Sequence, residues 1–471
     1  MSTQMKAEKG TVKIRMYRQG LGDCFLLAFN GDDGNPRYML IDCGVIQGTP
    51  DDSNKMIEVA ESIKEATNAH IHVLAITHEH WDHICGFAKA EKVFKEFEID
   101  QVWFGWTEDP DDKNAAALKE KKNSFLKALH LAVGKIKETN LGFADKLEGL
   151  LEFHGDLSAA SDKGTSASIM EMLKERAKPG KPFYLHPGQI QKVPGVPGIR
   201  VFVMGPPESK EMIERSSPRK GEVYLSALES GFFDAFKEEI FRKLDPGMKA
   251  SAESDTAAAI QKNPFDQSYM IDPNGEKSQP MEAPSYKYWN ENQWQRIDDL
   301  WLEASEELAL NLDSDTNNTS LVLAIELTGS GKVLLFPGDA QVGNWLSWEG
   351  LSWQVKGKNI TSRELLGRTV LYKVGHHGSH NATLREKGLE LMTNPGLTAM
   401  IPVEAEMAKK KRWKMPFEPL YDRLYDMSKG RIIRVDEGVT AEKPADVSQV
   451  TWDSFKEQVT ETPLYCEYTI K

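Results

Sequence analysis

The sequence of 471 residues predicts an α/β fold interrupted by two largely helical insertions. Apolar runs of strand length alternate with helical periodicity over residues 11–106, and strand signals return at 182–207 and over 316–471. Between them, residues 107–181 and 208–315 are rich in charged residues and have helical spacing. Such alternation is typical of layered α/β domains, so we expect the three strand-bearing segments to form one core.

In the first half of that core, the apolar run Ile71–Ile76 predicts a buried strand that leads into metal-type side chains. His78, His80, Asp82 and His83 fall within six positions, where a tight turn can direct all four toward one point. Imidazole nitrogen and carboxylate oxygen suit zinc, manganese or iron. A solvated histidine cluster is the alternative, and the ligand types and their spacing favour a metal site.

The other elements follow from the same patterns. Around this strand we expect strands at 12–16, 24–29, 38–43 and 102–104 and helices at 53–68 and 86–97. After the first insertion, strands are expected at 182–185 and 198–204. The last part of the chain predicts a hairpin at 320–336, strands at 369–374, 398–403 and 431–435, a helix at 420–427 and an edge strand at 464–470. Within the second insertion, helices are expected at 230–243 and 292–311.

Composition limits the classes of protein to which the chain can belong. The formal net charge of −13 argues against broad, non-specific binding of duplex nucleic acid through a basic surface. The N-terminal residues include no apolar h-region, and no run of about eighteen apolar residues occurs, so we expect a cytoplasmic protein without a membrane span. The four cysteines are far apart and form no CxxC motif, which favours reduced, buried thiols.

Two further turns that follow apolar strands carry metal-type residues, Asp339 after Phe-Pro-Gly and the pair His376-His377. Because strand ends are rigid platforms, residues far apart in sequence can converge there. The number of ligands indicates two divalent cations, zinc or manganese, with Asp339 as a bridge. Such cations lower the pKa of water and make it nucleophilic, which indicates hydrolysis. The expected metal ligands are His78, His80, Asp82, His83, Asp339 and His376.

Of the adjacent histidines, one is expected to bind metal and the other to face the substrate. His376 comes first after the strand and is the preferred ligand, which assigns His377 to catalysis. Asp82 and His380 are the other expected catalytic residues, and Ser379 is expected to contact the substrate.

These motifs resemble the metallo-β-lactamase fold. The His-x-His-x-Asp-His motif, the Phe-Pro-Gly-Asp turn and the His-His-Gly turn carry that resemblance. Five segments are similar to the branch that includes the hydrolase domain of bacterial competence (DNA-uptake) proteins, namely residues 20–23, 40–44, 317–320, 335–340 and 376–379. The resemblance covers residues 11–106, 182–207 and 316–437, and neither insertion has a counterpart.

The resemblance implies an αββα sandwich with the metals at one edge between the sheets, and phosphodiester hydrolysis as the leading activity. It also implies that Asp23 and Asp42 orient metal ligands by hydrogen bonds, although aspartate beside glycine equally suits a turn. Many members have a metal-binding histidine where this chain has Asn318, which is then expected beside the ligands. The site of His78 and His80 should therefore be the weaker one, with His154 and His186 as candidate replacements.

The sequence also contains one dense basic run, Lys409–Lys414, with Trp413 embedded in it. A basic run with a tryptophan suits contact with a phosphate and a base, and a solvated surface loop explains it equally well. The expected substrate-binding residues, besides Ser379, are Lys409, Lys410, Lys411 and Arg412.

The sequence therefore predicts a metal-dependent phosphodiesterase or nuclease that acts on DNA, RNA or a nucleotide. The acidic net charge favours single strands or small substrates over long duplex. One alternative is a lactone, thioester or β-lactam hydrolase on the same scaffold, and another is a non-catalytic interaction protein. Residues 107–181 and 208–315 are candidates for binding a protein partner or regulator.

Overall fold

The computed structural model describes residues 4–137, 147–149, 151–154, 164–177, 180, 182–215, 309–310, 312–411, 413–439 and 443–471. The helix expected at 230–243, and all but the end of the one expected at 292–311, lie outside the described residues. The chain divides into two compact units. One comprises Met1–Leu118, Glu152–Ser226 and Asp313–Lys471, and the other comprises Lys119–Leu151 and Ala227–Leu312.

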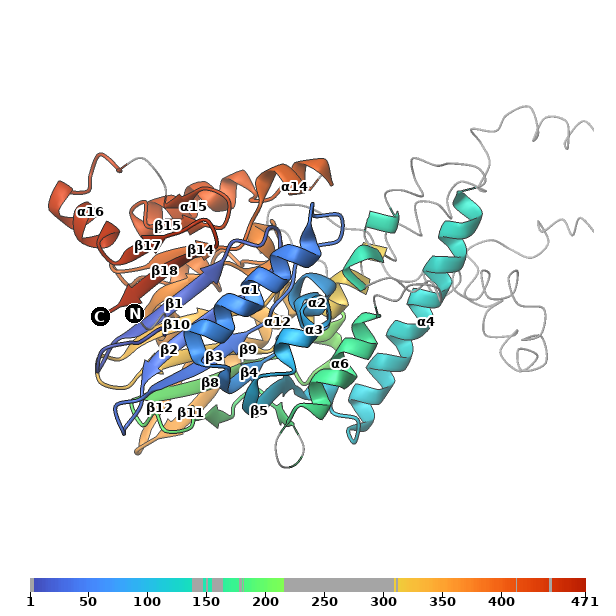
Figure 1. Ribbon diagram of the computed structural model, residues 1–471, viewed down its shortest axis with the longest axis horizontal. Coiled ribbons are helices and arrows are strands. Elements are labelled where there is room, and N and C mark those ends of the chain that lie inside the picture. The colour runs from blue at the N-terminus through green and yellow to red at the C-terminus, as the bar shows by residue number, and fades with distance from the viewer. Residues whose placement is uncertain are drawn as a thin grey trace, which may run out of the picture. The chain divides into compact units, whose positions relative to one another are not determined.

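The first unit contains two eight-stranded sheets (Figure 1), so the α/β class predicted from the sequence is confirmed. The first sheet has the order β17 (Val459–Glu461), β18 (Tyr465–Ile470), β1 (Val12–Tyr17), β2 (Phe25–Asn30), β3 (Pro36–Ile41), β4 (His70–Ala75), β5 (Glu98–Gly105) and β6 (Phe183–Leu185). The second has the order β16 (Gly438–Val439), β15 (Ile432–Arg434), β14 (Thr398–Ile401), β13 (Thr369–Lys373), β10 (Lys332–Phe336), β9 (Val322–Leu327), β8 (Ile199–Gly205) and β7 (Ile190–Gln191). A small hairpin pairs β11 (Ser352–Val355) with β12 (Lys358–Thr361).

Parallel pairing in both sheets decides where a site can form. In the first sheet β3, β4, β5 and β6 are parallel neighbours, and in the second β10, β13, β14 and β15 are. The carboxyl ends of parallel strands meet at one edge of a sheet, which is where ligands bind in open α/β folds. The hairpin of β9 and β10 is antiparallel, as predicted. The strand predicted at 464–470 is present as β18, but it is not an edge strand, because it lies between β1 and β17.

The helices of the first unit are short, apart from α1 (Asp52–Thr67), which lies across the first sheet in Figure 1. The others described are α2 (Trp81–Lys89), α3 (Glu91–Phe94), α6 (Ser166–Glu175), α7 (Lys210–Ile213), α12 (Val342–Ser347), α13 (Ser362–Gly367), α14 (Ala405–Lys410), α15 (Glu418–Ser428) and α16 (Gln449–Lys456). Helix α4 (Lys113–Ile136) begins in the first unit, and its later residues belong to the second. Over the described residues, no helix is both long and apolar enough to span a membrane.

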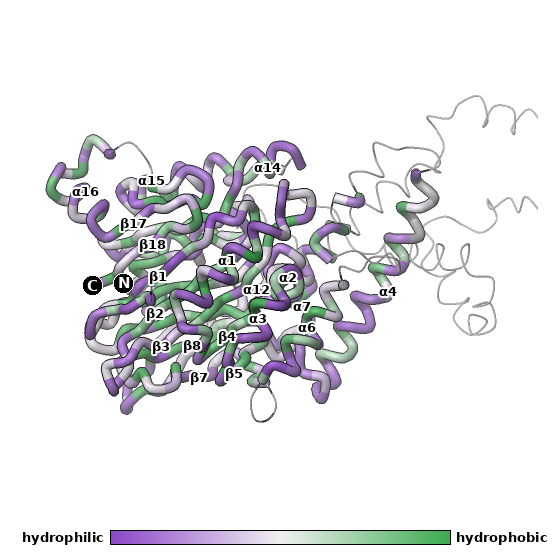
Figure 2. The backbone as a smooth tube through the Cα atoms, in the orientation of Figure 1, coloured by the Kyte–Doolittle hydropathy of each residue, from purple (hydrophilic) through white to green (hydrophobic). Residues whose placement is uncertain are grey.

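Three groups of buried apolar side chains hold these layers together, and Figure 2 shows the apolar residues gathered on the strands. The central group joins the inner faces of the two sheets, with Phe25 and Val73 from the first and Leu323 and Ile325 from the second. A second group joins the first sheet to α1, α2, α3 and α6, and a third joins the second sheet to α12, α13 and α15. Burial of this apolar surface supplies the main free energy of folding.

Replacing Ile325 by alanine should destabilise the fold by about 2–5 kcal/mol, because it leaves a cavity between the two sheets. The free energy of unfolding, measured by denaturant titration, checks this. Ile57→Ala is the matched control, since Ile57 is 39% exposed on α1 and should change stability far less. Equal losses for the two variants would contradict a core shared by the sheets.

Candidate metal centre

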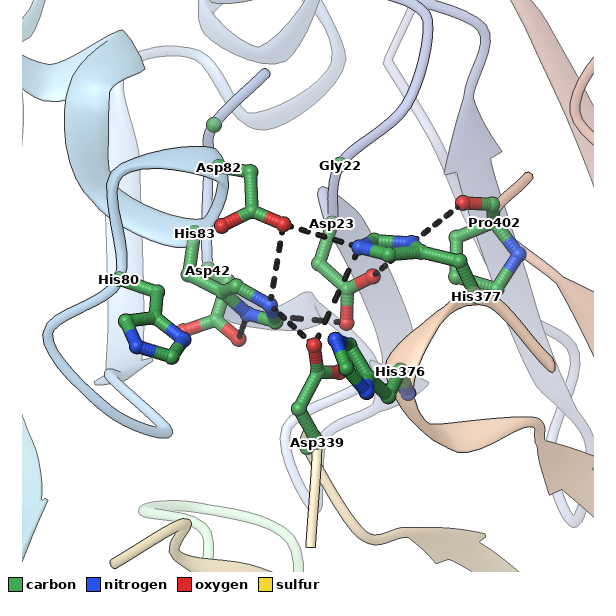
Figure 3. A network of polar contacts seen from close by, with 12 residues as sticks. Gly22, Asp23, Asp42, His80, Asp82, His83, Asp339, His376, His377 and Pro402 are labelled. Atoms are coloured by element: carbon green, nitrogen blue, oxygen red, sulfur yellow. Dashed lines mark hydrogen bonds and ion pairs between the residues drawn. The ribbon is translucent and has the colours of Figure 1, made fainter. Parts of the chain in front are cut away.

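Turns that follow strands of both sheets bring carboxylates and imidazoles close together (Figure 3). Ligand-type atoms of Asp82, His83, Asp339 and His377 all lie within 4.8 Å of one another, and all four residues are buried. Asp82 and His83 follow β4, Asp339 follows β10 and His377 follows β13. The structure thus brings together three of the predicted ligands with the histidine that was assigned to catalysis.

The start of helix α2 positions Asp82 and His83. A helix was expected at 86–97, but α2 begins at Trp81, so both residues lie in its first turn. A carboxylate there is stabilised by the helix dipole. Gly44 lets the chain approach closely, because a Cβ at this position would lie 2.4 Å from the carbonyl carbon of Asp82. Packing between this loop and the helix start therefore fixes where both side chains point.

Asp42 contacts His83 directly. Its Oδ2 lies 2.8 Å from Nδ1 of His83, and its two oxygens accept hydrogen bonds from N and Oγ1 of Thr77. Nε2 of His83 lies 3.1 Å from Oδ2 of Asp339, and because Asp42 holds Nδ1, it is Nε2 that could give up its proton to bind a cation. Among the described residues this Nε2 has no hydrogen-bond partner. The geometry is that of a histidine ligand held by a carboxylate.

The adjacent histidines differ in their hydrogen bonds. Nδ1 of His377 donates to the carbonyl of Pro402 at 2.7 Å, and its Nε2 lies 2.9 Å from Oδ2 of Asp82. Nδ1 of His376 instead accepts from Nε2 of Gln341 at 3.2 Å, which places a proton on its own Nε2. His377 therefore directs its Nε2 at a carboxylate of the cluster, whereas His376 presents an N–H that no described residue accepts. Both have positive φ, 43° for His376 and 54° for His377, and this turn points the rings in different directions.

Lys373 is a member of the site that the sequence analysis missed. It is 1% exposed, and its Nζ pairs with the carboxylate of Asp23, with Oδ1 of Asp339 at 3.1 Å and with the carbonyl of Gly338 at 2.8 Å. Asp23 thus reaches the site through Lys373, and its carboxylate lies 3.8 Å from Nδ1 of His83. A single lysine within an apolar strand was the signal that could have revealed it.

Electrostatics decide the protonation of these groups. Burial alone would lower the pKa of His83, but Asp339, Asp23 and Asp82 raise it well above its usual value. Burial would raise the pKa of Asp339, but His83 and Lys373 hold it well below its usual range. Burial also opposes the charge on Lys373, whose pKa the two neighbouring carboxylates nevertheless raise. The carboxylates thus hold both His83 and Lys373 in their charged forms, and such an environment suits a bound cation.

The residues predicted for the other metal lie beside this cluster. Nε2 of His78 is 2.9 Å from Nδ1 of His80, and burial lowers the pKa of both imidazoles well below the usual value. Asp313, also missed from the sequence, has Oδ1 3.8 Å from Nε2 of His80, and neither atom has a hydrogen-bond partner among the described residues. Of the candidate replacements, His154 packs against His80 with ring centroids 4.9 Å apart, while His186 pairs with Glu208 at 3.3 Å.

Asn318 makes different contacts from those expected. Its Nδ2 donates to the carbonyls of Ile213 and Arg215 at 3.0 and 3.1 Å, and its Oδ1 accepts from the backbone N–H of Asn344 at 3.0 Å. These bonds join the helical residues before β9 to α7 and α12. Ser320 is the neighbour that reaches the centre, with Oγ 3.4 Å from Nδ1 of His78.

The predicted substrate-side residues lie in two segments, the turn after His377 and the basic run. Ser379 is buried, and its Oγ lies 2.9 Å from Nδ1 of His376. His380 is exposed, with its ring 5.9 Å from that of Phe417. In the basic run, Lys409 and Lys410 are exposed at the end of α14, Lys411 is half-buried, and Arg412 lies outside the described residues.

A second group of metal-type residues, His70, His72 and Asp100, lies at the opposite end of β4. Nδ1 of His72 accepts a hydrogen bond from the backbone N–H of Tyr38 at 3.1 Å. Burial lowers the pKa of His72 to about 4, so the ring is neutral and its one lone pair is already used. This group is therefore better explained by packing of the strand ends than by a metal.

Asp42→Asn should weaken binding of a divalent cation about 10- to 100-fold, because His83 loses the carboxylate that orients it. Asparagine tolerates the left-handed backbone of this position, where φ is 55°, so the fold should persist. Competition with a chelator measures the affinity. Asp100→Asn is the matched control, since Asp100 also contacts a histidine at 2.9 Å. Unchanged affinity in Asp42→Asn would contradict the orienting role.

Lys373→Met should destabilise the metal-free protein by about 3–5 kcal/mol, because Asp23 and Asp339 lose their buried cation. Added Mn²⁺ should restore part of this loss, since it supplies positive charge at the same place. Denaturant unfolding with chelator and with Mn²⁺ separates the two effects. Lys387→Met, which removes an exposed ion pair with Glu349, should change little under either condition. A loss that Mn²⁺ does not reduce would argue against this electrostatic account.

Comparison with solved structures matches a metallo-β-lactamase family protein from Thermus thermophilus, with 15% sequence identity and a TM-score of 0.19. The match covers 42% of this chain and 52% of that chain, so it spans about half the length of the matched structure. No protein-family model matches the chain, and no curated protein matches it.

Proposed function

We propose that the protein is a metal-dependent hydrolase of the metallo-β-lactamase fold and that its substrates are phosphodiesters. The observation that carries the proposal is the buried group of Asp82, His83, Asp339 and His377, whose ligand-type atoms lie within 4.8 Å of one another. Oδ1 of Asp82 and Nε2 of His83 have no hydrogen-bond partner among the described residues, as expected for atoms that bind a cation. Zinc or manganese held there supplies Lewis acidity and lowers the pKa of a water molecule.

The hydrogen bonds of His376 and His377 indicate a different role for each of them. In this proposal His377, rather than His376, is the ligand, because its Nδ1–H is fixed by Pro402 and its Nε2 faces Asp82. Burial lowers the pKa of His376 to about 4, so its ring is neutral. Its Nε2–H then donates to a phosphoryl oxygen and stabilises the charge that develops there. His78 and His80 would hold the second, weaker cation.

The surroundings of His376 support a phosphodiester over other hydrolysable bonds. Lys409 and Lys410 at the end of α14 are exposed cations on a chain of net charge −13. They are followed by Trp413, whose ring stacks on Phe153, and Phe153 in turn lies 6.3 Å from His376 between ring centroids. An aromatic pair that reaches His376 from the end of a basic run suits the base and phosphate of a nucleic acid or nucleotide.

His376→Ala and His377→Ala should have different effects on the Mn²⁺-loaded protein. His377→Ala should lose bound metal and activity together. His376→Ala should keep its metal and lose about 10²- to 10³-fold in kcat, as expected when one donor to a developing charge is removed. Metal analysis and hydrolysis of bis(p-nitrophenyl) phosphate measure the two quantities, with His186→Ala as the exposed-histidine control. The proposed function fails if the wild type hydrolyses no phosphodiester with either Mn²⁺ or Zn²⁺.

A further inference from the structure

A short turn from the first insertion lies against the candidate metal centre. Residues Glu152–His154 form one turn of 3₁₀ helix, and Phe153 and His154 are buried. The backbone carbonyl of Glu152 accepts a hydrogen bond from Nε2 of Gln47 at 3.3 Å, which ties the turn to the loop after β3. The turn belongs to the same compact unit as both sheets, so its contacts with them are contacts within one unit.

The turn contacts the basic run in two ways. The carboxylate of Glu152 forms an ion pair with Nζ of Lys411. The ring of Phe153 stacks on that of Trp413, with centroids 5.0 Å apart and planes at 20°. On this side of the turn, the carboxylate of Glu152 therefore lies on Lys411 and the ring of Phe153 lies on Trp413.

The other side of the turn reaches the metal-type histidines. The ring of Phe153 lies 5.4 Å from that of His80 and 6.3 Å from that of His376. His154 packs edge-on against His80, with ring centroids 4.9 Å apart. The turn thus contacts the metal-type histidines on one side and the basic run on the other.

An anion beside a planar ring is also what a nucleotide presents. We propose that Lys411 and Trp413 form a nucleotide subsite, for one phosphate and its neighbouring base, and that Glu152 and Phe153 occupy this subsite as an internal mimic. The inference rests on the phosphodiesterase function proposed above and adds a substrate class and a form of self-inhibition. A nucleotide must displace the carboxylate from Lys411 and the phenyl ring from Trp413 before it reaches His376.

The strengths of these contacts allow such an exchange. The side chains of Lys411 and Glu152 are 16% and 27% exposed, so water and salt weaken their ion pair. A phosphate carries more charge than a carboxylate and forms stronger hydrogen bonds with an ammonium group. A base offers Trp413 a larger flat surface than a phenyl ring does. If the turn served only for packing, removing Phe153 would leave nucleotide binding unchanged or make it weaker.

The test compares adenosine monophosphate with ribose monophosphate, which lacks the base, on the full-length Mn²⁺-loaded protein. Glu152→Gln should tighten binding of both ligands, because Lys411 is released in each case. Phe153→Ala should tighten binding of adenosine monophosphate alone, by about tenfold, since only a base can replace the ring on Trp413. Adding Trp413→Ala to Phe153→Ala should remove this gain. Calorimetric titration gives the dissociation constants.

Controls separate local from general effects. Glu349→Gln removes an exposed Glu–Lys ion pair elsewhere, and Phe183→Ala removes a phenyl ring that is 42% exposed, so neither should change nucleotide binding. Thermal unfolding identifies any variant that fails to fold. Glu152→Gln and Phe153→Ala are made separately, so if one of them fails to fold, the other still tests the inference.

Nucleotide binding that is weaker or unchanged in both turn variants overturns the inference. Hydrolysis of bis(p-nitrophenyl) phosphate, measured on the same preparations, tests the proposed function separately. Activity without any gain in nucleotide binding would reject the mimic and keep the phosphodiesterase.

Discussion

Buried negative charge is the constraint on which the rest of the centre depends. Asp23, Asp42, Asp82 and Asp339 are all buried around one point, and Lys373 is the buried lysine among them. In a medium of low dielectric constant, carboxylates at these distances cannot all remain charged without further positive charge. In the metal-free protein His83 and His377 supply it by binding protons, which is why their pKa values are raised. His83 and His377 are among the residues that would hold a divalent cation, whose charge would replace that of the protons.

The backbone at the strand ends is strained so that these groups can converge. Asp42, His376 and His377 all have left-handed φ values, 55°, 43° and 54°. Such conformations cost on the order of 1–3 kcal/mol each for residues other than glycine. Local hydrogen bonds offset the cost, since Oδ1 of Asp339 accepts from the backbone N–H of His376 at 2.9 Å and Asp42 accepts from Thr77. This turn gives the two neighbouring imidazoles different partners, since Nε2 of His377 faces Asp82 while Nδ1 of His376 accepts from Gln341.

The sequence predicts those parts of the candidate metal centre that depend only on the spacing of residues along the chain. His78, His80, Asp82 and His83 follow one strand, so their proximity needs no knowledge of the tertiary fold. The choice between His376 and His377 depends on φ angles and hydrogen-bond partners far away in sequence, and spacing cannot provide these. Lys373 and Asp313 were missed because burial of a charged side chain is set by the packing of both sheets. The edge strand was misplaced because β17, which covers β18, is short and its three residues are partly or fully exposed, so it has no clear apolar pattern.

Residues 107–181, which have no counterpart in the resemblance, bring a phenyl ring next to the most polar part of the fold. Phe153 lies against His80 and His376 and contributes to the burial that lowers the pKa of both imidazoles. In the proposed exchange a base replaces this ring and a phosphate replaces the carboxylate of Glu152, and the phosphate would bring more negative charge to a centre that already holds four buried carboxylates. Its binding would then depend on the cations, and the cations would in turn bind more tightly in its presence, because such coupling is reciprocal.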